Sequence, residues 1–419
     1  MRPTRARWER VSVAEVCESI VDCVNKTAPT VDEPTPYKMI RTTNVKKGWV
    51  NLSEVKFVTK ETFDRWTRRQ LPRKGDVILT REAPLGEVGM LRGDDQVFLG
   101  QRLVSYRANP AKLDNRFLLY AFQGRDVQAQ VKGLGSGATV EHMRVPDCEK
   151  LTLSLPPLSE QRRIASILSA YDDLIENNTR RIAILEEMAR RIYEEWFVRF
   201  RFPGHEQVKM LESELGLIPE GWKVVAASDA ITINPKVRVP KEGLKPFVPM
   251  GSLSENSMLI SDIEEREGNS GSKFQNGDTL FARITPCLEN GKTGFVQFLP
   301  ADDSVAFGST EFIVLRSRSL CPEYVYALAR SDEFRANAMK SMSGATGRQR
   351  VKEACFDSFL LPQPDVETLQ RYGEIVRPMF AMIRKLAAKN ANLRATRDLL
   401  LPKLISGELD VSKLPEPTV

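Results

Sequence analysis

The chain has 419 residues, a length that predicts two domains of ordinary size. It carries 61 Lys and Arg against 55 Asp and Glu, and the resulting net charge of +6 is compatible with a polyanionic partner without establishing one. No apolar run approaches the roughly 18 residues of a membrane span. Six cysteines without a Cys-x-x-Cys pair, and only two histidines, argue against a structural zinc site. We therefore expect no bound metal and a cytoplasmic protein with reduced, mostly buried thiols.

Residues 1–157 are predicted to form a globular domain. Short β-rich runs such as GDVILT (residues 75–80) are separated by glycine, proline and polar turns. Basic residues cluster near aromatic ones in TRARWER (residues 4–10) and RWTRRQLPRK (residues 65–74). Each cluster is either a solvated charged face or a surface that contacts phosphates.

Residues 158–203 are predicted to form one long helix that begins at Ser159 as N-cap and ends at Pro203-Gly204. Its apolar residues recur at alternating steps of four and three, the heptad seam of a coiled coil. The seam residues are Ile164, Leu168, Tyr171, Ile175, Asn178, Ile182, Leu185, Ala189, Ile192 and Trp196. A seam of this length needs a partner helix.

Residues 204–364 are predicted to form a second globular domain, with β-rich runs DTLFARI (278–284) and EFIVLRS (311–317). A further basic cluster, NPKVRVPKEGLKP, occupies residues 234–246.

Residues 365–419 are predicted to form the partner helix and a tail, with Asp365 as N-cap and Gly407 as stop. The seam is repeated 208 residues after the first. Its members are Tyr372, Val376, Met379, Ile383, Leu386, Asn390, Leu393, Arg397, Leu400 and Leu404. Pro378 removes one helical hydrogen bond and should kink the first turns. Gly373 and Arg397 also depart from a regular seam.

The globular regions repeat each other in the same order. The matching pairs are Trp8 with Trp222, residues 75–78 with 277–280, Arg81 and Pro84 with Arg283 and Pro286, residues 97–102 with 305–310, and residues 136–145 with 343–351. Each match alone is weak, but the ordered series indicates two copies of one unit, a globular domain followed by a long helix. His142 and His205 have no counterparts in this comparison.

The sequence contains almost no catalytic motif. It has no Gly-x-Gly-x-x-Gly after a strand, and GLGSGATV lacks the lysine and hydroxyl of a P-loop. The Asn-Pro-Pro-Tyr/Phe signature of amino methyltransferases is also absent. A binding module is therefore favoured. A methyltransferase or nuclease with a cryptic site, and a structural scaffold that does not bind DNA, remain alternatives.

The repeat plan, the central segment LSLPPLSEQRRIASILSAYDDLIENNTRRIAILEEMARRIYEEWFVRFRFPG, the following SELGLIPEGW and the closing LLLPKLISGELDV resemble the specificity (S) subunit of type I restriction-modification systems. The resemblance covers essentially the whole chain. It implies an α+β fold in which two globular mixed α/β target recognition domains in tandem repeat are separated by two long antiparallel helices that form a coiled-coil spacer.

The same resemblance implies the partners. Such a subunit is not an enzyme; it binds double-stranded DNA at a bipartite, asymmetric target and recruits two methyltransferase (M) subunits and, when present, two restriction (R) subunits. This chain itself would bind no cofactor, and the partner subunits would use S-adenosylmethionine, ATP and Mg²⁺. The helix pair would set the spacing of the two half-sites.

Candidate DNA-binding residues are side chains able to form paired hydrogen bonds with base edges, and small hydroxyl residues, in the repeated segments. They are Arg81, Gln101, Arg102 and Arg144 in the first domain, and Arg283, Ser309, Thr310, Arg348 and Arg350 in the second. For each of them a surface salt bridge or a structural cap is the alternative. The repeated SGAT segments, residues 136–139 and 343–346, are predicted to be structural turns beside the DNA.

Overall fold

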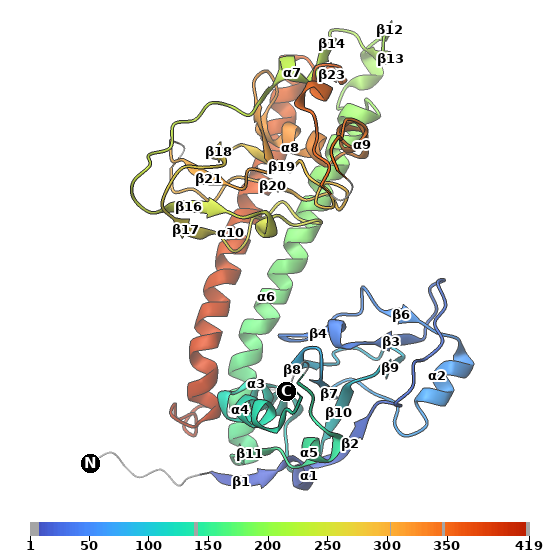
Figure 1. Cartoon of the computed structure of the whole chain (residues 1–419), viewed down its shortest axis with the longest axis vertical. Helices are drawn as coiled ribbons and strands as arrows, with labels where there is room; N and C mark the ends of the chain where they lie inside the picture. The colour runs from blue at the N-terminus through green and yellow to red at the C-terminus, as the bar shows by residue number, and fades with distance from the viewer. Residues whose placement is uncertain (1–7, 138–140, 302, 346–347, 416–419) are drawn as a thin grey trace. The chain divides into compact units, whose positions relative to one another are not determined.

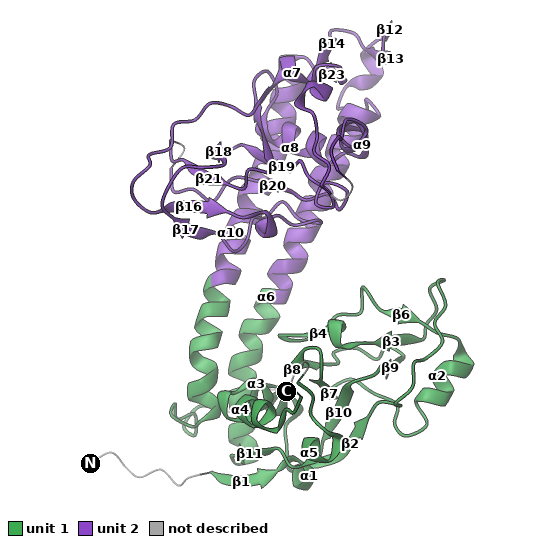
Figure 2. Ribbon diagram, in the orientation of Figure 1, with its two compact units in different colours: residues 1–175, 392–419 green, residues 176–391 purple. Residues whose placement is uncertain are grey.

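The computed structural model of the chain describes residues 8–137, 141–301, 303–345 and 348–415 (Figure 1). They form two compact units. Unit 1 comprises residues 1–175 and 392–419, and unit 2 comprises residues 176–391 (Figure 2). Each long helix therefore contributes one segment to each unit.

Unit 1 is built around a six-stranded sheet of order β2-β10-β7-β8-β5-β4, with a three-stranded sheet β6-β3-β9 and a two-stranded sheet β1-β11. Its elements are β1 (Glu9–Ser12), α1 (Val13–Val16), β2 (Cys17–Asp22), β3 (Lys38–Ile40), β4 (Val45–Lys46), β5 (Gly48–Val50), β6 (Lys56–Phe57), α2 (Lys60–Trp66), β7 (Val77–Arg81), β8 (Leu85–Met90), β9 (Val97–Leu99), β10 (Leu103–Ala108), α3 (Asn115–Gln123), α4 (Arg125–Leu134), α5 (Val145–Glu149) and β11 (Thr152–Leu155).

Unit 2 has two four-stranded sheets, β15-β22-β19-β20 and β17-β16-β21-β18, and two-stranded sheets β14-β23 and β12-β13. Its elements are β12 (Met210–Ser213), β13 (Gly216–Pro219), β14 (Lys223–Ala226), α7 (Ala227–Ala230), β15 (Ile231–Ile233), β16 (Lys245–Val248), β17 (Glu264–Arg266), β18 (Ser272–Phe274), β19 (Thr279–Ala282), β20 (Thr293–Phe295), β21 (Ala306–Gly308), β22 (Phe312–Ser317), α8 (Pro322–Arg330), α9 (Asp332–Lys340), the 3-10 helix η5 (Glu353–Phe356) and β23 (Leu360–Gln363).

The two units repeat one topology, as the ordered sequence matches predict. In unit 1, β10 pairs antiparallel with β2 and β7, and in unit 2, β22 pairs antiparallel with β15 and β19. The parallel pair β3–β9 corresponds to β16–β21, and β1–β11 corresponds to β14–β23. Each sheet is followed by two short helices, α3–α4 or α8–α9.

The long helices are part of the domain cores. In unit 1, Leu79 and Tyr106 from the sheet, Phe117 from α3, and Ile164 and Leu168 from the first long helix form one buried cluster. Burial of each such side chain contributes roughly 1.5 to 3 kcal/mol. The start of this helix is therefore fixed to the domain that precedes it in the chain.

The first long helix, α6, spans Leu158–Tyr193 and continues as a π-helical turn, η2 (Glu194–Val198). It begins one residue before Ser159, where the amides of Glu160 and Gln161 donate to the carbonyl of Pro157. Pro157 therefore occupies the N-cap position, and the prediction that Ser159 is the N-cap is wrong by two residues. The helical conformation also ends at Val198, before the predicted stop at Pro203.

The second long helix, α10, spans Val366–Ile405 and agrees with the predicted caps. The Asp365 carboxylate accepts from the Thr368 amide at 2.8 Å and from Trp222 Nε1 at 3.2 Å. Gly407 adopts a left-handed φ of 73° just beyond the helix. The helix runs without a break through Pro378, whose side chain is exposed.

The two helices pack antiparallel within each unit. In unit 2, the rings of Trp196 and Tyr372 lie 6.0 Å apart, and Asn178 Nδ2 donates to Asn390 Oδ1 at 2.9 Å. The described seam residues are all buried or half-buried. Asn178 and Asn390 are only 3% and 2% exposed, so the amide pair satisfies two polar groups inside an apolar seam.

Arg397 departs from the seam pattern, and the structure provides its partner. In unit 1, Arg397 Nη1 lies 2.5 Å from Asp172 Oδ1, and the hydroxyl of Tyr120 donates to Asp172 Oδ2 at 2.7 Å. Burial, together with the neighbouring Asp172 carboxylate, raises the pKa of Tyr120, so the phenol stays protonated and donates. The cation in the seam is therefore neutralised across the helix pair.

Replacing Arg397 by Leu should lower the free energy of unfolding by about 3 to 5 kcal/mol, because Asp172 would remain buried without its cation. The double replacement Asp172→Leu/Arg397→Leu should recover most of that loss. Asp398→Ala removes only an exposed partner of Arg397 and should cost less than about 0.5 kcal/mol. Urea unfolding of the full chain, followed by circular dichroism, measures all three. A loss for Arg397→Leu no larger than that for Asp398→Ala would contradict a buried ion pair.

Candidate nucleic-acid interface

Three loops meet beyond the end of β7 in unit 1. The amide of Arg81 donates to the carbonyl of Arg102 at 2.8 Å, and the amide of Met143 donates to the carbonyl of Arg81 at 2.9 Å. Glu82 and His142 form an isolated β-bridge. The structure therefore brings together the segments that carry all four candidate residues of the first domain. We call residues 81–84, 100–102 and 136–144 the loop edge of unit 1; residues 138–140 lie outside the described part.

Unit 2 repeats this arrangement beyond the end of β19. The amide of Arg283 donates to the carbonyl of Glu311 at 3.0 Å, and the amide of Val351 donates to the carbonyl of Arg283 at 2.9 Å. Ile284 and Arg350 form the corresponding β-bridge. The loop edge of unit 2 consists of residues 283–286, 309–311 and 343–352, of which 346 and 347 lie outside the described part.

These backbone contacts correct the sequence comparison of the two copies. They pair Arg102 with Glu311 and His142 with Arg350, whereas the sequence pairs Arg102 with Thr310 and leaves His142 without a counterpart. Arg144, which the sequence aligned with Arg350, corresponds to Lys352. Both residues directly precede a short helix, α5 or η5. The loops of the two units differ in length. Arginines at neighbouring but not equivalent positions were therefore aligned in the sequence comparison.

Arg81 and Arg283 hold the loop edges together. The guanidinium of Arg81 donates to the carbonyl of Met143 at 2.9 Å, and that of Arg283 donates to the carbonyl of Val351 at 3.2 Å. Arg283 also pairs with Glu353 at 3.2 Å and has a side chain only 25% exposed. These contacts engage both guanidinium groups in anchoring the third loop.

Two other candidates support turns. Arg144 Nε donates to Asp147 at 2.9 Å, and hydrogen bonds from Arg144 and Lys150 lower the pKa of Asp147. Ser309 Oγ accepts from the amide of Glu311 at 3.2 Å. The candidates with exposed side chains on the loop edges are Gln101, Arg102, Arg144, Thr310, Arg348 and Arg350.

The loop edges carry ion pairs of opposite arrangement. In unit 1, Arg102 on the second loop pairs with Glu82 on the first at 3.2 Å. In unit 2, the second loop carries the carboxylate, Glu311, which accepts two-point hydrogen bonds from Arg350 on the third loop at 2.6 to 3.1 Å. Hydrogen bonds from Arg350 lower the pKa of Glu311, so the carboxylate stays ionised and holds the arginine. The two loop edges therefore share one backbone arrangement, but the exposed arginine comes from the second loop in unit 1 and from the third loop in unit 2.

Each third loop contains a glycine that no other residue type would replace without strain. Gly137 and Gly344, from the repeated SGAT segments, have φ of 127° and 131°. Residues with a Cβ rarely adopt such angles. This explains why the Ser-Gly sequence is repeated, and it agrees with the prediction of structural turns; Thr139 and Thr346 lie outside the described residues.

A cationic hollow adjoins the loop edge of unit 2. Two cavities of about 610 and 420 Å³ share Thr310 as a lining residue. Lys236, Lys273 and Arg283 line the larger one, and neither lysine forms an ion pair within the described residues. Lys236 belongs to the basic cluster of residues 234–246. Lys273 was not singled out by the sequence, because an isolated lysine in a β-rich segment gives no signal.

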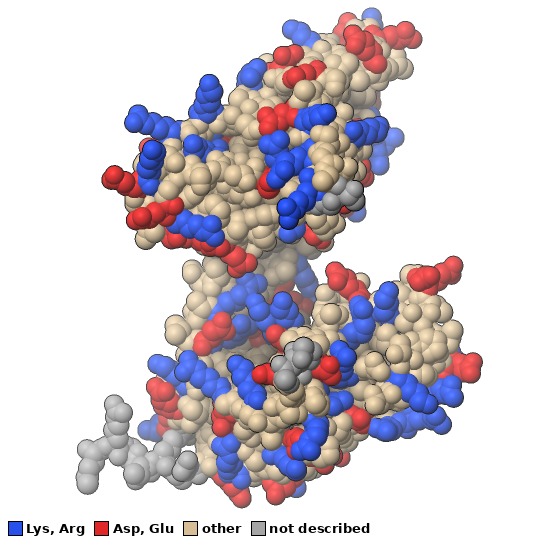
Figure 3. Space-filling view, viewed as in Figure 1, with Lys and Arg blue, Asp and Glu red and all other residues tan. Residues whose placement is uncertain are grey.

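The basic cluster of unit 1 lies around α2, where Figure 3 shows Lys and Arg side chains gathered on the surface. Arg69 pairs with Asp22, and Arg73 pairs with Glu18 at 3.2 Å. Lys74 has no such partner within the described residues. Of the first predicted cluster, only residues 8–10 are described, and there Arg10 is engaged by Asp126 and Thr152.

Other kinds of site find no support in the described residues. They contain no group of three His, Cys, Asp or Glu side chains placed to hold a metal ion. All six cysteines are free thiols, and burial raises the pKa of Cys17 to about 12 and that of Cys148 to about 11. No helix in the described part of the chain combines the length and apolarity needed to cross a membrane.

Known proteins resemble this chain in sequence and in fold. Residues 6–187 match the family described as the type I restriction modification DNA specificity domain. The chain is 25% identical to the type I restriction enzyme MjaIX specificity subunit of Methanocaldococcus jannaschii, over 85% of this chain and 82% of that one. It is 32% identical to the EcoEI specificity subunit of Escherichia coli, over 39% of this chain and 28% of that one. The crystal structure of the S subunit from M. genitalium superposes with a TM-score of 0.57 at 15% identity, covering 96% of this chain and 97% of that one, and this shows the shared fold.

The duplicated domain-and-helix fold, with a polar loop edge in each copy, is the fold of a known type I restriction-modification S subunit. Residues 6–187 match the type I restriction modification DNA specificity domain, and most of the chain is similar to a type I restriction enzyme specificity subunit. The function of this chain is DNA target recognition within such a system, and it is not itself a catalytic subunit.

Replacing Arg283 by Gln should lower the free energy of unfolding by about 1 to 3 kcal/mol, because the Val351 carbonyl and Glu353 lose a charged donor. Arg348→Gln is the matched control: the side chain is exposed and has no partner within the described residues, so stability should change by less than about 0.5 kcal/mol. Thermal unfolding of the two variants measures both changes in stability. Equal stability of both would show that Arg283 does not anchor the loop.

Proposed function

We propose that the chain reads a bipartite, asymmetric DNA target, with one half recognised by each globular domain. In this proposal residues 1–157 and 204–364 are the target recognition domains, and residues 158–203 and 365–419 are the helices between them. One observation carries the proposal: the two loop edges share a backbone frame but differ in the side chains they expose. Two domains that share a backbone shape but expose different side chains are suited to recognise two different half-sites.

The residues proposed to face DNA are the exposed ones on the loop edges. Arg102 and Arg350 are 50% and 52% exposed, and each is oriented by a carboxylate that is itself mostly covered, Glu82 or Glu311. An arginine held in this way loses less side-chain freedom when it binds, and its free N–H groups can bond a guanine edge or a phosphate. Gln101, Thr310 and Arg348 extend the two surfaces. Arg81, Arg283, Ser309 and Arg144 act by supporting the loops.

The helix pair is proposed to set the distance between the half-sites. Support comes from the tight fixing of each helix to a domain core and from the buried Asn178–Asn390 pair, which holds one register of α6 against α10. Two readers on one face of B-DNA are separated by about one helical turn, roughly 34 Å, or a multiple of it.

The remaining partners are proposed from the similarity to type I restriction enzyme specificity subunits. The subunit is proposed to recruit two methyltransferase subunits and two restriction subunits in the cytoplasm. S-adenosylmethionine, ATP and Mg²⁺ would be bound by those subunits. Within the described residues of this chain, the loop edges contain hydrogen-bonding and ionic groups but no metal cluster.

Arg102→Gln and Arg350→Gln test the assignment of one reader to each half-site. Each should relax recognition in one half of the target only, because loss of a two-point guanine contact costs about 1 to 3 kcal/mol at that half. The readout is genome-wide adenine methylation in cells that contain each variant and its methyltransferase subunit. If both variants relaxed the same half, the assignment would be wrong. No change in either variant would show that these arginines are not readers.

Lengthening both helices tests the spacing. Four residues inserted after Arg181 and four after Lys389, 208 residues later, keep the two seams in matching phase and add about 6 Å of helical rise. The variant should methylate the same half-sites with a gap longer by one or two base pairs, at about 3.4 Å each. Two-residue insertions at the same points are the control and should destabilise the protein, because they rotate the seam. Methylation at the original spacing by the four-residue variant would contradict the proposed role of the helices.

A further inference from the structure

The first part of α6 is joined to the domain of unit 1 by directed polar contacts. Gln161, which is only 1% exposed, accepts from the amide of Asp114 at 2.8 Å and donates to the carbonyl of Lys112 at 3.0 Å. A hydrogen bond weakens steeply when its partners shift or tilt. These contacts therefore fix the position of α6 against the domain that precedes it in the chain.

The last part of α6 is joined to the domain of unit 2 by Glu186. One carboxylate oxygen of this half-buried residue accepts from the hydroxyl of Ser257 and from the amide of Met258, both at 2.7 Å. Met258 is only 1% exposed and belongs to the main buried cluster of the unit. Glu186 therefore binds a segment that is packed into the domain core.

The segment that Glu186 binds is bonded in turn to the sheet that carries the loop edge of unit 2. The amide of Phe295 in β20 donates to the carbonyl of Met258 at 3.0 Å, and β20 pairs antiparallel with β19. Arg330 of α8 donates at 2.8 Å to the carbonyl of Glu255, which lies in the same segment. Because β19 leads into the loop edge, a short series of hydrogen bonds connects α6 with the proposed DNA-reading residues.

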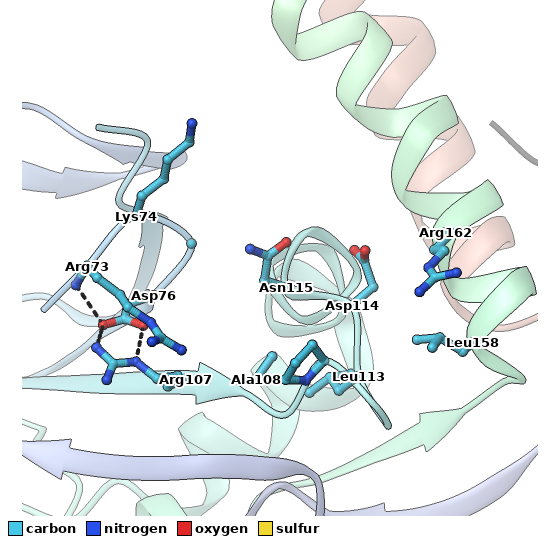
Figure 4. A pocket seen from close by; sticks show the side chains of 12 residues that line it. Arg73, Lys74, Asp76, Arg107, Ala108, Leu113, Asp114, Asn115, Leu158 and Arg162 are labelled. Atoms are coloured by element: carbon cyan, nitrogen blue, oxygen red, sulfur yellow. Dashed lines mark hydrogen bonds and ion pairs between the residues drawn. The ribbon is translucent and has the colours of Figure 1, made fainter. Parts of the chain in front are cut away.

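A buried ion pair makes the strands of this sheet move together. Asp278, just before β19, is 1% exposed and accepts from Arg316 of β22 at 2.6 Å through both oxygens. Unit 1 has the same pair, Asp76 with Arg107, at the start of β7 (Figure 4). A shift of β20 against α6 would therefore carry β19 and the loop edge with it.

The corresponding segment of unit 1 is also joined to α6, but through different groups. This segment is β5, which pairs with β8 much as Met258 bonds to β20. The guanidinium carbon of Arg92 lies 3.6 Å from the centre of the Trp49 ring in β5, and Arg92 Nη1 lies 3.1 Å from Asp173 of α6. A carboxylate of α6 thus holds this part of the fold in both units.

Apolar packing around Glu186 is incomplete. A cavity of about 480 Å³ lies beside it, between α6 on one side and the end of α8 and the start of α9 on the other. Apolar contacts are non-directional, and an unfilled space lacks the close packing that resists displacement. The hydrogen bonds to Glu186 therefore supply directional resistance to sliding at a place where packing supplies little.

We infer that Glu186 is a positioning residue that restricts recognition to a single gap between the two half-sites. The inference rests on the proposed reading of a bipartite target. One additional base pair displaces a half-site by about 3.4 Å and rotates it by roughly 35° around the DNA axis. A displacement of that size would break both hydrogen bonds to Glu186. In this role Glu186 acts through Ser257 and Met258, and not by contact with DNA.

Three variants of the full chain test the inference. Glu186→Leu removes the acceptor and keeps a side chain of similar size, whereas Glu186→Gln keeps an oxygen that accepts from both donors. Glu187→Leu is the matched control, because the Glu187 carboxylate is bound by Arg190 and Arg191 of the same helix. Each variant is placed in cells with its methyltransferase subunit. Methylated adenines are mapped across the genome and sorted by the gap between the half-sites.

The unaltered chain should methylate targets of one gap. In Glu186→Leu, methylation at gaps one base pair longer or shorter, relative to the original gap, should rise about tenfold, as expected when charge-assisted hydrogen bonds are lost. Glu186→Gln should restore the single gap. Glu187→Leu should change the ratio by less than about twofold, because it removes only ion pairs on the helix surface.

An unchanged gap preference in Glu186→Leu, or equal broadening in Glu187→Leu, would overturn the inference. If Glu186→Leu is too unstable to methylate DNA, Ser257→Ala is measured in the same way, because it removes one donor and keeps the Met258 amide. It should raise the ratio about threefold, and no rise would overturn the inference. A single gap retained by Glu186→Leu would leave the proposed DNA-reading function intact. Methylation by the unaltered chain at targets without two separate halves would contradict that function itself.

Discussion

The register of α6 against α10 is the constraint on which the rest of the molecule depends. An apolar seam of this length would tolerate several sliding positions, because one leucine or isoleucine layer resembles the next. Polar groups remove that freedom: Asn178 must meet Asn390 in unit 2, and Asp172 must meet Arg397 in unit 1. Any shift would leave these groups buried without partners, which is costly in free energy. The same helices supply core residues to the domains, so a defined register also defines how each domain core is completed.

The two domains have the same backbone arrangement but carry different exposed side chains on their loops. The buried Asp–Arg pair at one end of the central strand, the arginine anchor at its other end and the glycine of the third loop are present in both units. These features decide where the loops lie. The exposed side chains carried by the loops differ between the units. Structural demands act on buried groups, and exposed positions are free to diverge.

Regular features of the fold could be predicted from sequence, because their signals are periodic or local. The heptad steps from Ile164 to Trp196, the cap at Asp365 and the ordered repeat all depend on residue spacing alone. Arg397 looked like a defect, since its partner Asp172 is 225 residues away and on the other long helix. The candidate loop residues of each unit lie in one neighbourhood of the structure. The alignment of the loops of the two units, and the role of each loop residue, could not be predicted from the sequence. Backbone hydrogen bonds between distant segments set the register of these loops, which differ in length.

Unit 2 is formed by one continuous segment, whereas unit 1 needs residues from both ends of the chain. Leu404 and Val411 are 2% exposed and belong to the same buried cluster as Phe117 and Ile164. During synthesis the first domain therefore leaves the ribosome with part of its core surface uncovered. It stays uncovered while the whole second domain is being made. Completion of the earliest domain waits for the last helix, and a chain arrested before that helix would expose apolar surface of the kind that chaperones and proteases recognise.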